Sequence, residues 1–154
     1  MPEPLLLDRL LLVSELFQRD MARAFAGTPL SPARMAVLWT LHHDGPSTQQ
    51  ALASALGVSP RNITGLVDAL EESGHVNRVS HPTDRRAHLV ELTEAGTQLM
   101  RTTAREHAHL SAALSEAVDA ADRETLDRAL DAVTARLRQL IEEQREEVPH
   151  DPHR

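Results

Sequence analysis

The chain has 154 residues, of which 41% are hydrophobic and 25% charged, and its formal net charge is −7 at pH 7. This length supports one domain with a hydrophobic core and is short for two. The absence of cysteine excludes disulfides, thiolate metal sites and cysteine catalysis, and because there is no glycine-rich phosphate loop, G-x-S-x-G or H-E-x-x-H motif, we expect neither an enzyme nor a cofactor.

The first predicted element is a helix over residues 5–26. Its leucines are interrupted by Asp8 and Arg9, so the segment has neither the roughly 20 apolar residues of a membrane span nor the apolar core of a signal peptide. We therefore expect a cytoplasmic protein without membrane contact. Apolar residues occupy nearly the whole circumference of this helix, which indicates that it is buried in something larger.

Three further helix starts are marked by capping residues. Ser31-Pro32 and Ser59-Pro60 each combine a capping serine with a proline at the first helical position, where its missing N–H costs nothing. Residues 47–50, Ser-Thr-Gln-Gln, have the S-x-x-Q spacing of a capping box, which predicts Ser47 as a helix cap. The resulting helices are expected over residues 32–43, 48–56 and 60–73.

The last two of these helices have the spacing of a DNA-binding helix-turn-helix, with Gly57 in the turn between them. In the second helix, apolar residues fall at i, i+3, i+4 and i+7, which predicts one buried stripe. The stripe consists of Ile63, Leu66, Val67 and Leu70. The outward face then carries Arg61, Asn62, Thr64, Gly65 and Asp68, of which Arg61 is the best candidate to contact guanine and Asn62 to contact adenine.

A β-hairpin is predicted next, because two β-prone runs, 76–80 and 87–92, flank the six-residue segment HPTDRR. Pro82 and Asp84 favour a turn there. Between residues 75 and 88, Arg78, Arg85 and Arg86 accompany a single acid, whereas residues 94–147 contain 12 acids and 7 arginines. The negative net charge is therefore concentrated away from the hairpin, which is where a polyanion would bind.

Residues 93–147 show only helical patterns. One helix is capped at Thr93-Glu94, and a second follows an interruption near residues 119–122. These helices have more apolar surface than a small winged helix can cover, so we expect terminal helices of two copies to pair. The apolar stripe on the second of these two helices consists of Leu126, Leu130, Val133, Leu137, Leu140 and Ile141.

The tail, 148–154, is expected to be disordered.

The segment ALGVSPRNITGLVDALEESGHVNRVSHPTDRRAHLVELTEAG, residues 55–96, resembles the MarR family of bacterial transcriptional regulators, and the resemblance covers nearly the whole chain. It implies a mainly α fold with a small β-hairpin wing: a winged helix-turn-helix core over residues 31–92, with dimerisation helices at 5–26 and 93–147. It also implies a homodimer on pseudo-palindromic double-stranded operator DNA, with recognition helices in successive major grooves and wings in the flanking minor grooves.

The resemblance maps the family's D-x-R wing motif onto Asp84 and Arg86, with the arginine in the minor groove and the aspartate orienting it. A narrow minor groove has an enhanced negative potential, which favours such a guanidinium, and Arg85 is expected to face phosphate. The family often carries a basic residue where this chain has Gly65, so either the helix approaches DNA closely there or a contact is missing. The expected DNA-binding residues are Ser47, Ser59, Arg61, Asn62, Thr64, Gly65, Arg78, Asp84, Arg85 and Arg86.

The resemblance further implies a repressor that is released by a small aromatic or drug-like ligand. Met35, Trp39 and His42 lie at i, i+4 and i+7 of the second helix, and an apolar site with one polar group suits such an effector. The simpler alternative makes Trp39 an ordinary core residue.

Two alternatives keep the same fold. The pairs His42, His43 and His107, His109 do not have the i, i+3 or i, i+4 spacing that places ligands on one helix face, so no metal site is predicted. A zinc-responsive regulator with ligands from two helices, His42 and His107, is nevertheless one alternative. The other is a winged-helix protein-interaction module without DNA binding, against which the arginines on the presumed DNA face weigh.

Overall fold

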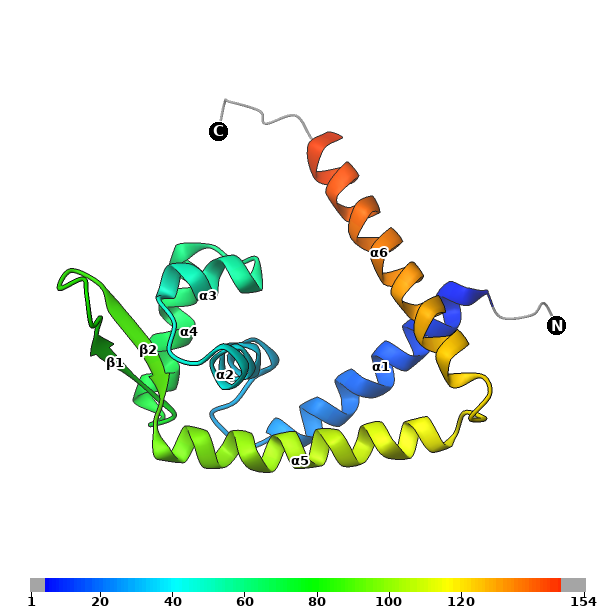
Figure 1. Cartoon of the computed structure of the whole chain (residues 1–154), viewed down its shortest axis with the longest axis horizontal. Coiled ribbons are helices and arrows are strands. Elements are labelled where there is room, and N and C mark those ends of the chain that lie inside the picture. The colour runs from blue at the N-terminus through cyan, green and yellow to red at the C-terminus, as the bar shows by residue number, and fades with distance from the viewer. Residues whose placement is uncertain (1–4, 148–154) are drawn as a thin grey trace. The chain divides into compact units, whose positions relative to one another are not determined.

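The computed structural model describes residues 5–147, with side chains described as far as residue 144, and it forms two units that divide between Ala104 and Arg105. The predicted fold class is confirmed, because the described residues form six helices and one two-stranded antiparallel sheet (Figure 1). The predicted disordered tail lies outside the described residues. In chain order the elements are α1 (Leu6–Phe25), α2 (Pro32–Asp44), α3 (Gln49–Leu56), α4 (Pro60–Glu72), β1 (Val76–Ser80), β2 (His88–Leu92), α5 (Glu94–Glu116) and α6 (Arg123–Glu147).

Helices α2 and α4 begin at their predicted serine caps. The Ser31 hydroxyl accepts a hydrogen bond from the Arg34 backbone N–H, and the Ser59 hydroxyl accepts one from the Asn62 N–H, each at 3.2 Å. A proline follows each cap in the first turn, where its lack of an N–H removes no helical hydrogen bond. Between α3 and α4, Gly57 has φ +64°, a left-handed conformation that glycine adopts readily and that ends α3.

Ser47 does not have the predicted capping role. The N-cap of α3 is Thr48, whose hydroxyl accepts from the Ala51 N–H at 3.2 Å. Ser47 instead pairs with Val90 of β2 through its backbone N–H and C=O, at 3.0 and 2.8 Å. Its hydroxyl donates to the Gly45 carbonyl at 3.0 Å. The capping-box prediction is wrong because this strand pairing holds Ser47 in extended backbone outside the helix.

The core of the first unit lies among α2, α3, α4 and the hairpin. The stripe predicted on α4 faces inward, since Ile63, Val67 and Leu70 are buried and Leu66 is half-buried. Burial of this stripe removes apolar area from water and leaves the opposite side of α4 exposed. The other buried residues of the core are Met35, Val37, Leu38, Leu41, Leu52, Ala53, Val76, Val90 and Met100.

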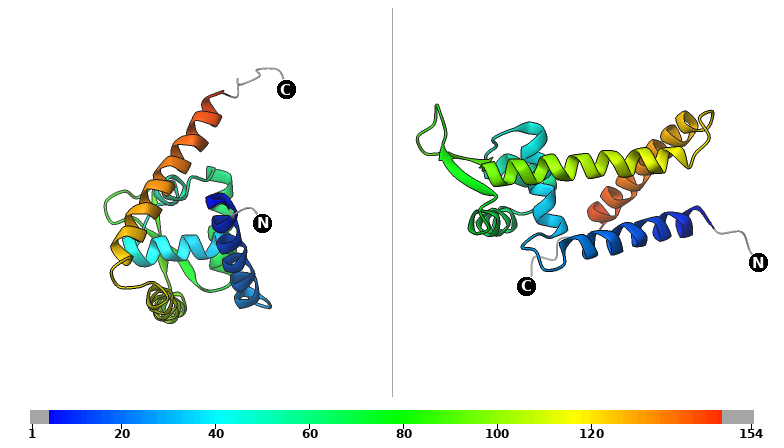
Figure 2. Two further views of the ribbon diagram at one scale, coloured as in Figure 1. Left: turned by 90° about the vertical axis from the view of Figure 1, so that its right-hand side faces the viewer. Right: turned by 90° about the horizontal axis from the view of Figure 1, so that it is seen from below.

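Strands β1 and β2 form the predicted hairpin, with a register that runs from Val76 opposite Leu92 to Ser80 opposite His88. The connecting tip spans residues 81–87, one residue more than predicted. Ala87 belongs to the tip because its N–H donates to the Asp84 carbonyl and its own carbonyl accepts from the His81 N–H, both at 3.1 Å. The hairpin extends away from α2, α3 and α4 (Figure 2), and we call it the wing.

Helices α1 and α6 expose apolar side chains. No residue of α1 is buried, and Leu7 remains 62% exposed. In the second unit, Leu137 of α6 remains 55% exposed. Among the described residues, no helix combines the length and the apolar character that crossing a membrane requires. Each unit therefore contains a helix with apolar side chains that remain exposed to water in a single copy of the chain.

Candidate nucleic-acid interface

Exposed polar residues occupy the first turns of α4. Arg61, Asn62, Thr64 and Gly65 are all exposed, as the buried stripe on the opposite face predicts. In the part of the chain that the structure describes, the Arg61 guanidinium has no hydrogen-bond or ion-pair partner. The beginning of a helix also carries a partial positive charge, which favours anions. This end of α4 therefore attracts anions through both its backbone and a side chain.

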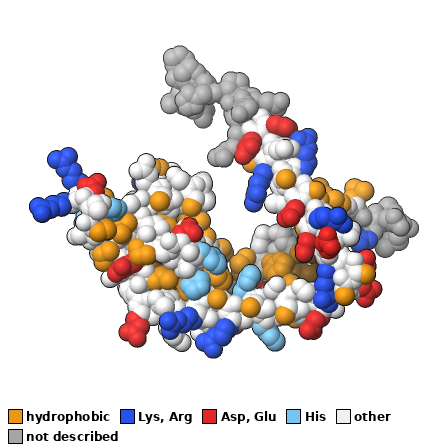
Figure 3. All heavy atoms as spheres, in the orientation of Figure 1, with side chains coloured by type: hydrophobic (Ala, Val, Ile, Leu, Met, Phe, Trp, Pro, Cys, Tyr) orange, Lys and Arg blue, Asp and Glu red, His pale blue; other side chains and the backbone are white. Residues whose placement is uncertain are grey.

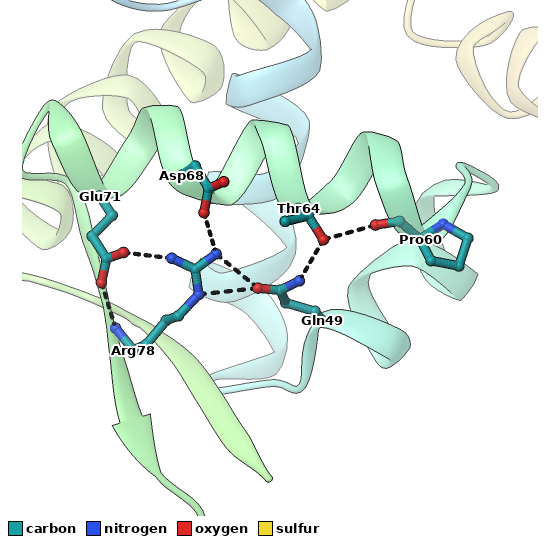
Figure 4. A network of polar contacts seen from close by, with 6 residues as sticks. All are labelled: Gln49, Pro60, Thr64, Asp68, Glu71 and Arg78. Atoms are coloured by element: carbon teal, nitrogen blue, oxygen red, sulfur yellow. Dashed lines mark hydrogen bonds and ion pairs between the residues drawn. The ribbon is translucent and has the colours of Figure 1, made fainter.

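A polar network connects the wing to helix α4 (Figure 4). Its centre is Arg78 of β1, whose Nη2 donates to Oδ1 of Asp68 at 2.5 Å and whose Nη1 donates to Oε2 of Glu71. The other oxygen of Glu71 accepts the backbone N–H of Arg78 at 3.2 Å. Two carboxylates from successive turns of α4 thus hold the first wing strand against this helix.

Gln49 extends the network to α3. Its Oε1 accepts from Nε and Nη2 of Arg78 at 3.0 and 2.9 Å, and its Nε2 donates to the Thr64 hydroxyl at 2.9 Å. The Thr64 hydroxyl in turn donates to the Pro60 carbonyl at 2.9 Å. Residues from α3, α4 and β1 are therefore joined by side-chain hydrogen bonds.

The charge of Arg78 is balanced within the protein. Burial is the largest single influence on the pKa of Arg78 and lowers it, but the hydrogen bonds and negative charges of Asp68 and Glu71 together outweigh burial and raise this pKa above its ordinary value. Arg78 thus remains a cation with two carboxylate partners. It differs in this respect from the other arginines that sequence analysis assigns to DNA binding.

Hydrogen bonds from backbone N–H groups to two side chains organise the wing tip. Nδ1 of His81 accepts the backbone N–H groups of Thr83 and Asp84, at 3.3 and 3.2 Å. Oδ1 of Asp84 accepts the backbone N–H of Arg86 at 2.9 Å. Among the described residues, no ion pair joins the Asp84 carboxylate to the Arg86 guanidinium. Asp84 therefore orients Arg86 through its backbone and leaves its guanidinium available.

Arg85 and Arg86 are both exposed, and basic side chains project from the end of the wing (Figure 3). Over residues 5–144, neither guanidinium has a hydrogen-bond or ion-pair partner. With Arg61, they supply three cations that no acid of the described chain neutralises. This is the charge pattern of a surface that binds a polyanion.

The predicted effector residues lie close together on α2. Met35 is buried, while Trp39 and His42 are half-buried and their rings meet edge to face with centroids 5.9 Å apart. The ring of His43 stacks on Trp39 at 5.4 Å. Trp39 also packs against the hydrophobic core, as its simpler alternative role requires.

No group of three or more histidine, aspartate or glutamate side chains lies together in metal-binding geometry within the described residues.

Three residues that organise the interface are not indicated by the sequence patterns above: Gln49, Glu71 and His81. A signal for Glu71 is its spacing from Asp68: acids at i and i+3 share a helix face, and the following strand carries an arginine. No comparable local signal marks Gln49 or His81.

Comparisons with known proteins agree with this architecture. A MarR family sequence model matches residues 30–88. The chain is 31% identical over 108 residues to an uncharacterized HTH-type transcriptional regulator of Mycobacterium bovis. The matched residues cover 70% of this chain and 76% of that relative.

Two solved structures resemble the chain over most of its length. The crystal structure of RV1404 from Mycobacterium tuberculosis has a TM-score of 0.69 and 29% identity, covering 88% of this chain and 96% of that one. Streptococcus pneumoniae FabT, crystallised in complex with DNA, shares the fold with a TM-score of 0.74 at 18% identity, covering 84% and 94%. The winged helix-turn-helix architecture and the sequence matches together show that this chain belongs to the MarR family of DNA-binding transcriptional regulators.

Proposed function

We propose that this protein is a homodimeric repressor that binds a pseudo-palindromic operator and is released by a small aromatic or drug-like ligand. The observation that supports it most directly is the contrast among the arginines of the first unit. Among the described residues, Arg61, Arg85 and Arg86 are exposed without an acidic partner, whereas Arg78 is held by two carboxylates. Cations that face water are the ones that can neutralise phosphates.

In this proposal the first turns of α4 enter the major groove. Arg61 would donate to guanine and Asn62 to adenine, the pairings that their donor and acceptor groups favour. The Ser59 hydroxyl accepts from Asn62 within the helix cap and keeps its own proton for a phosphate. The Ser47 hydroxyl already donates to Gly45, so a phosphate contact there requires that bond to break.

The wing would place Arg86 in the adjacent minor groove and Arg85 against phosphate. A slim hairpin suits this, because the side chains of His81 and Asp84 accept backbone N–H groups of its tip. Within the described part of the chain, neither guanidinium has a partner. We assign Arg78 a positioning role in place of the predicted DNA contact, since a phosphate would compete with Asp68 and Glu71 for its guanidinium.

The exposed apolar residues of α1 and α6 support the dimer. Their burial between two copies would remove a large apolar area from water, which is the main driving force for association. A twofold dimer presents two α4 helices to half-sites about one helical turn, roughly 10 bp, apart.

Fluorescence anisotropy with labelled duplexes that tile the DNA upstream of the protein's own gene tests DNA binding. We expect tight binding to one duplex that weakens steeply with salt. Arg86→Ala should weaken it tenfold or more, roughly the value of one specific contact. Arg128→Ala on α6 removes the same charge and should have little effect. Salt-insensitive binding, or equal losses for both variants, contradicts the proposal.

Ligand release can be followed at Trp39, the only tryptophan of the chain. Benzoate, a minimal aromatic acid, should change its fluorescence and lower operator affinity over the same concentration range. Joint changes are required because a ligand shifts DNA binding only through different affinities for two protein states. A fluorescence change without DNA release would exclude Trp39 from the effector site for this ligand class.

A further inference from the structure

The hydrogen bonds that run from Arg78 to Thr64 have one fixed direction (Figure 4). An arginine guanidinium carries only donors. The Gln49 atom at 3.0 and 2.9 Å from Nε and Nη2 of Arg78 must therefore be the amide oxygen. This places the amide nitrogen toward Thr64. The positive charge of Arg78 thus decides which end of the Gln49 amide meets the helix α4.

The same logic fixes the Thr64 hydroxyl. A hydroxyl has one proton and two lone pairs. Because Nε2 of Gln49 donates to Oγ1 of Thr64 at 2.9 Å, one lone pair is occupied. The proton is donated to the Pro60 carbonyl at 2.9 Å. Thr64 is exposed on α4, yet the groups it has left to offer are one lone pair and its methyl group.

We propose that Thr64 selects an A·T base pair in the operator half-site, because the Pro60 carbonyl takes its proton and the Gln49 amide, oriented by Arg78, takes one of its lone pairs. Gln49 is a positioning residue here, because its amide oxygen is bound to Arg78 and its amide nitrogen to Thr64. The inference rests on the proposed placement of α4 in the major groove. Placing α4 in the major groove does not determine which base pair lies opposite Thr64, and this inference concerns that base pair.

The chemistry of the major groove gives the preference its direction. Guanine presents only acceptors there, O6 and N7, which a threonine without a free proton cannot satisfy. An A·T pair presents the adenine amino group, which can donate to the remaining lone pair, and the thymine methyl, which packs against an apolar group. The cytosine of a G·C pair also presents an amino donor but has no methyl, so an acceptor and a methyl side by side match A·T better than G·C.

The probe for the test is the duplex that the wild-type protein selects from a randomised 30-bp library. Each thymine of a half-site is replaced in turn by deoxyuridine, which removes only the C5 methyl, and affinity is measured by anisotropy. We expect one position at which wild type loses about fourfold, the value of one buried methyl. Thr64→Ser should lose this sensitivity, whereas Thr64→Val, which keeps methyl groups, should retain it.

The role of Gln49 is tested by the ratio of affinities for duplexes with A·T and G·C at that position. Gln49→Met removes three hydrogen bonds at nearly constant size, two from Arg78 and one to Thr64. The Thr64 hydroxyl is then no longer held in one orientation and can turn its proton from the Pro60 carbonyl toward a guanine acceptor, which should lower this ratio about tenfold, within the range of one base contact. Gln50→Met makes the same change one residue further along α3, outside the network, and should leave the ratio unchanged.

The inference is overturned if Thr64→Ser keeps the deoxyuridine effect, or if Gln49→Met and Gln50→Met give the same ratio. The Thr64 variants retain Gln49 and Arg78, so they decide the question even where Gln49→Met folds poorly. Failure of the wild type to select any duplex contradicts the proposed function itself. Selection without a deoxyuridine-sensitive position contradicts this inference alone.

Discussion

Nη2 of Arg78 in β1 lies 2.5 Å from Oδ1 of Asp68 in α4, and this ion pair joins the wing to the proposed recognition helix. The Arg78 side chain is 24% exposed and the Asp68 side chain 61%. Water screens a pair with so exposed a partner, so its contribution to folding is about 1 kcal/mol at most. The main consequence is geometric, because the two elements that we assign to DNA are held to each other.

A double-mutant cycle with Asp68→Asn and Arg78→Met should show a coupling of about 0.5–1 kcal/mol in urea unfolding at low salt, and less in 1 M NaCl. Salt concentration, and not pH, is the appropriate variable for testing this ion pair. Because the pKa of Arg78 is raised, its stabilisation is complete below the unfolded-state pKa and is lost only as pH rises through the folded value, far above neutrality.

The matched control for this cycle is the pair Arg136 and Glu143 of α6, at 3.3 Å with both side chains more than half exposed. We expect no measurable coupling there. A coupling as large as that of Asp68 and Arg78 would show that the network around Arg78 has no particular importance for the first unit.

Gly96, in the first turn of α5, has no space for a side chain. A Cβ added there would lie 2.0 Å from the carbonyl oxygen of His75, a backbone atom that cannot turn aside. Gly96→Ala should therefore lower the free energy of unfolding by about 1–3 kcal/mol, the usual cost of overpacking, although alanine favours helices. Urea denaturation measures this; an unchanged midpoint would show that α5 and His75 can separate without cost.

Gly65 provides the opposite case within α4. Among the described residues, a Cβ added there meets no atom within 4 Å apart from the adjoining backbone of its own helix. Gly65→Ala should thus raise the free energy of unfolding by about 1 kcal/mol, the difference in helix propensity. Operator affinity of the same variant then separates the two readings of this glycine, because a loss indicates close approach to DNA and no change indicates a missing contact. A destabilised variant would contradict the expected open space.

Local patterns predict the elements of this fold because their causes are local. A serine followed by proline starts a helix at Ser31 and Ser59, and apolar spacing orients α4. The corrections come from contacts between distant segments. Ser47 pairs with β2, and Gln49 contacts Arg78, 29 residues away. In neither case does the sequence around the residue indicate its distant partner.

The same distinction applies to the candidate site. Exposure of Arg61 and of the wing arginines follows from element positions and could be predicted. That Arg78 is neutralised is indicated only by Asp68 and Glu71, which share a face of α4 ahead of its strand, because no residue next to Arg78 in the sequence marks it. The difference is a strand position that turns Arg78 toward the acids of α4.

His81 holds the wing tip by accepting the N–H groups of Thr83 and Asp84 on one ring nitrogen. His81→Leu removes both hydrogen bonds and should weaken operator binding about three- to tenfold, the value of one or two net hydrogen bonds. His81→Asn can accept the same bonds in an Asx turn and should recover most of the loss. Equal losses for the two variants would mean that the ring contacts DNA itself.

Leu137 of α6, 55% exposed in a single copy of the chain, tests the dimer. Leu137→Glu should raise the dimer dissociation constant roughly a hundredfold or more, because a twofold interface loses each buried leucine twice, at about 1.5–3 kcal/mol apiece. Gln139→Glu adds the same charge to the same helix at a polar position and should dimerise normally. Light scattering across a dilution series gives both constants.

A monomeric wild type at micromolar concentration, or a Leu137→Glu variant that dimerises as tightly as Gln139→Glu, would exclude this part of α6 from a dimer interface. Loss of operator binding by Leu137→Glu, together with loss of the dimer, would connect the apolar helices to DNA recognition by arginines that the substitution does not touch.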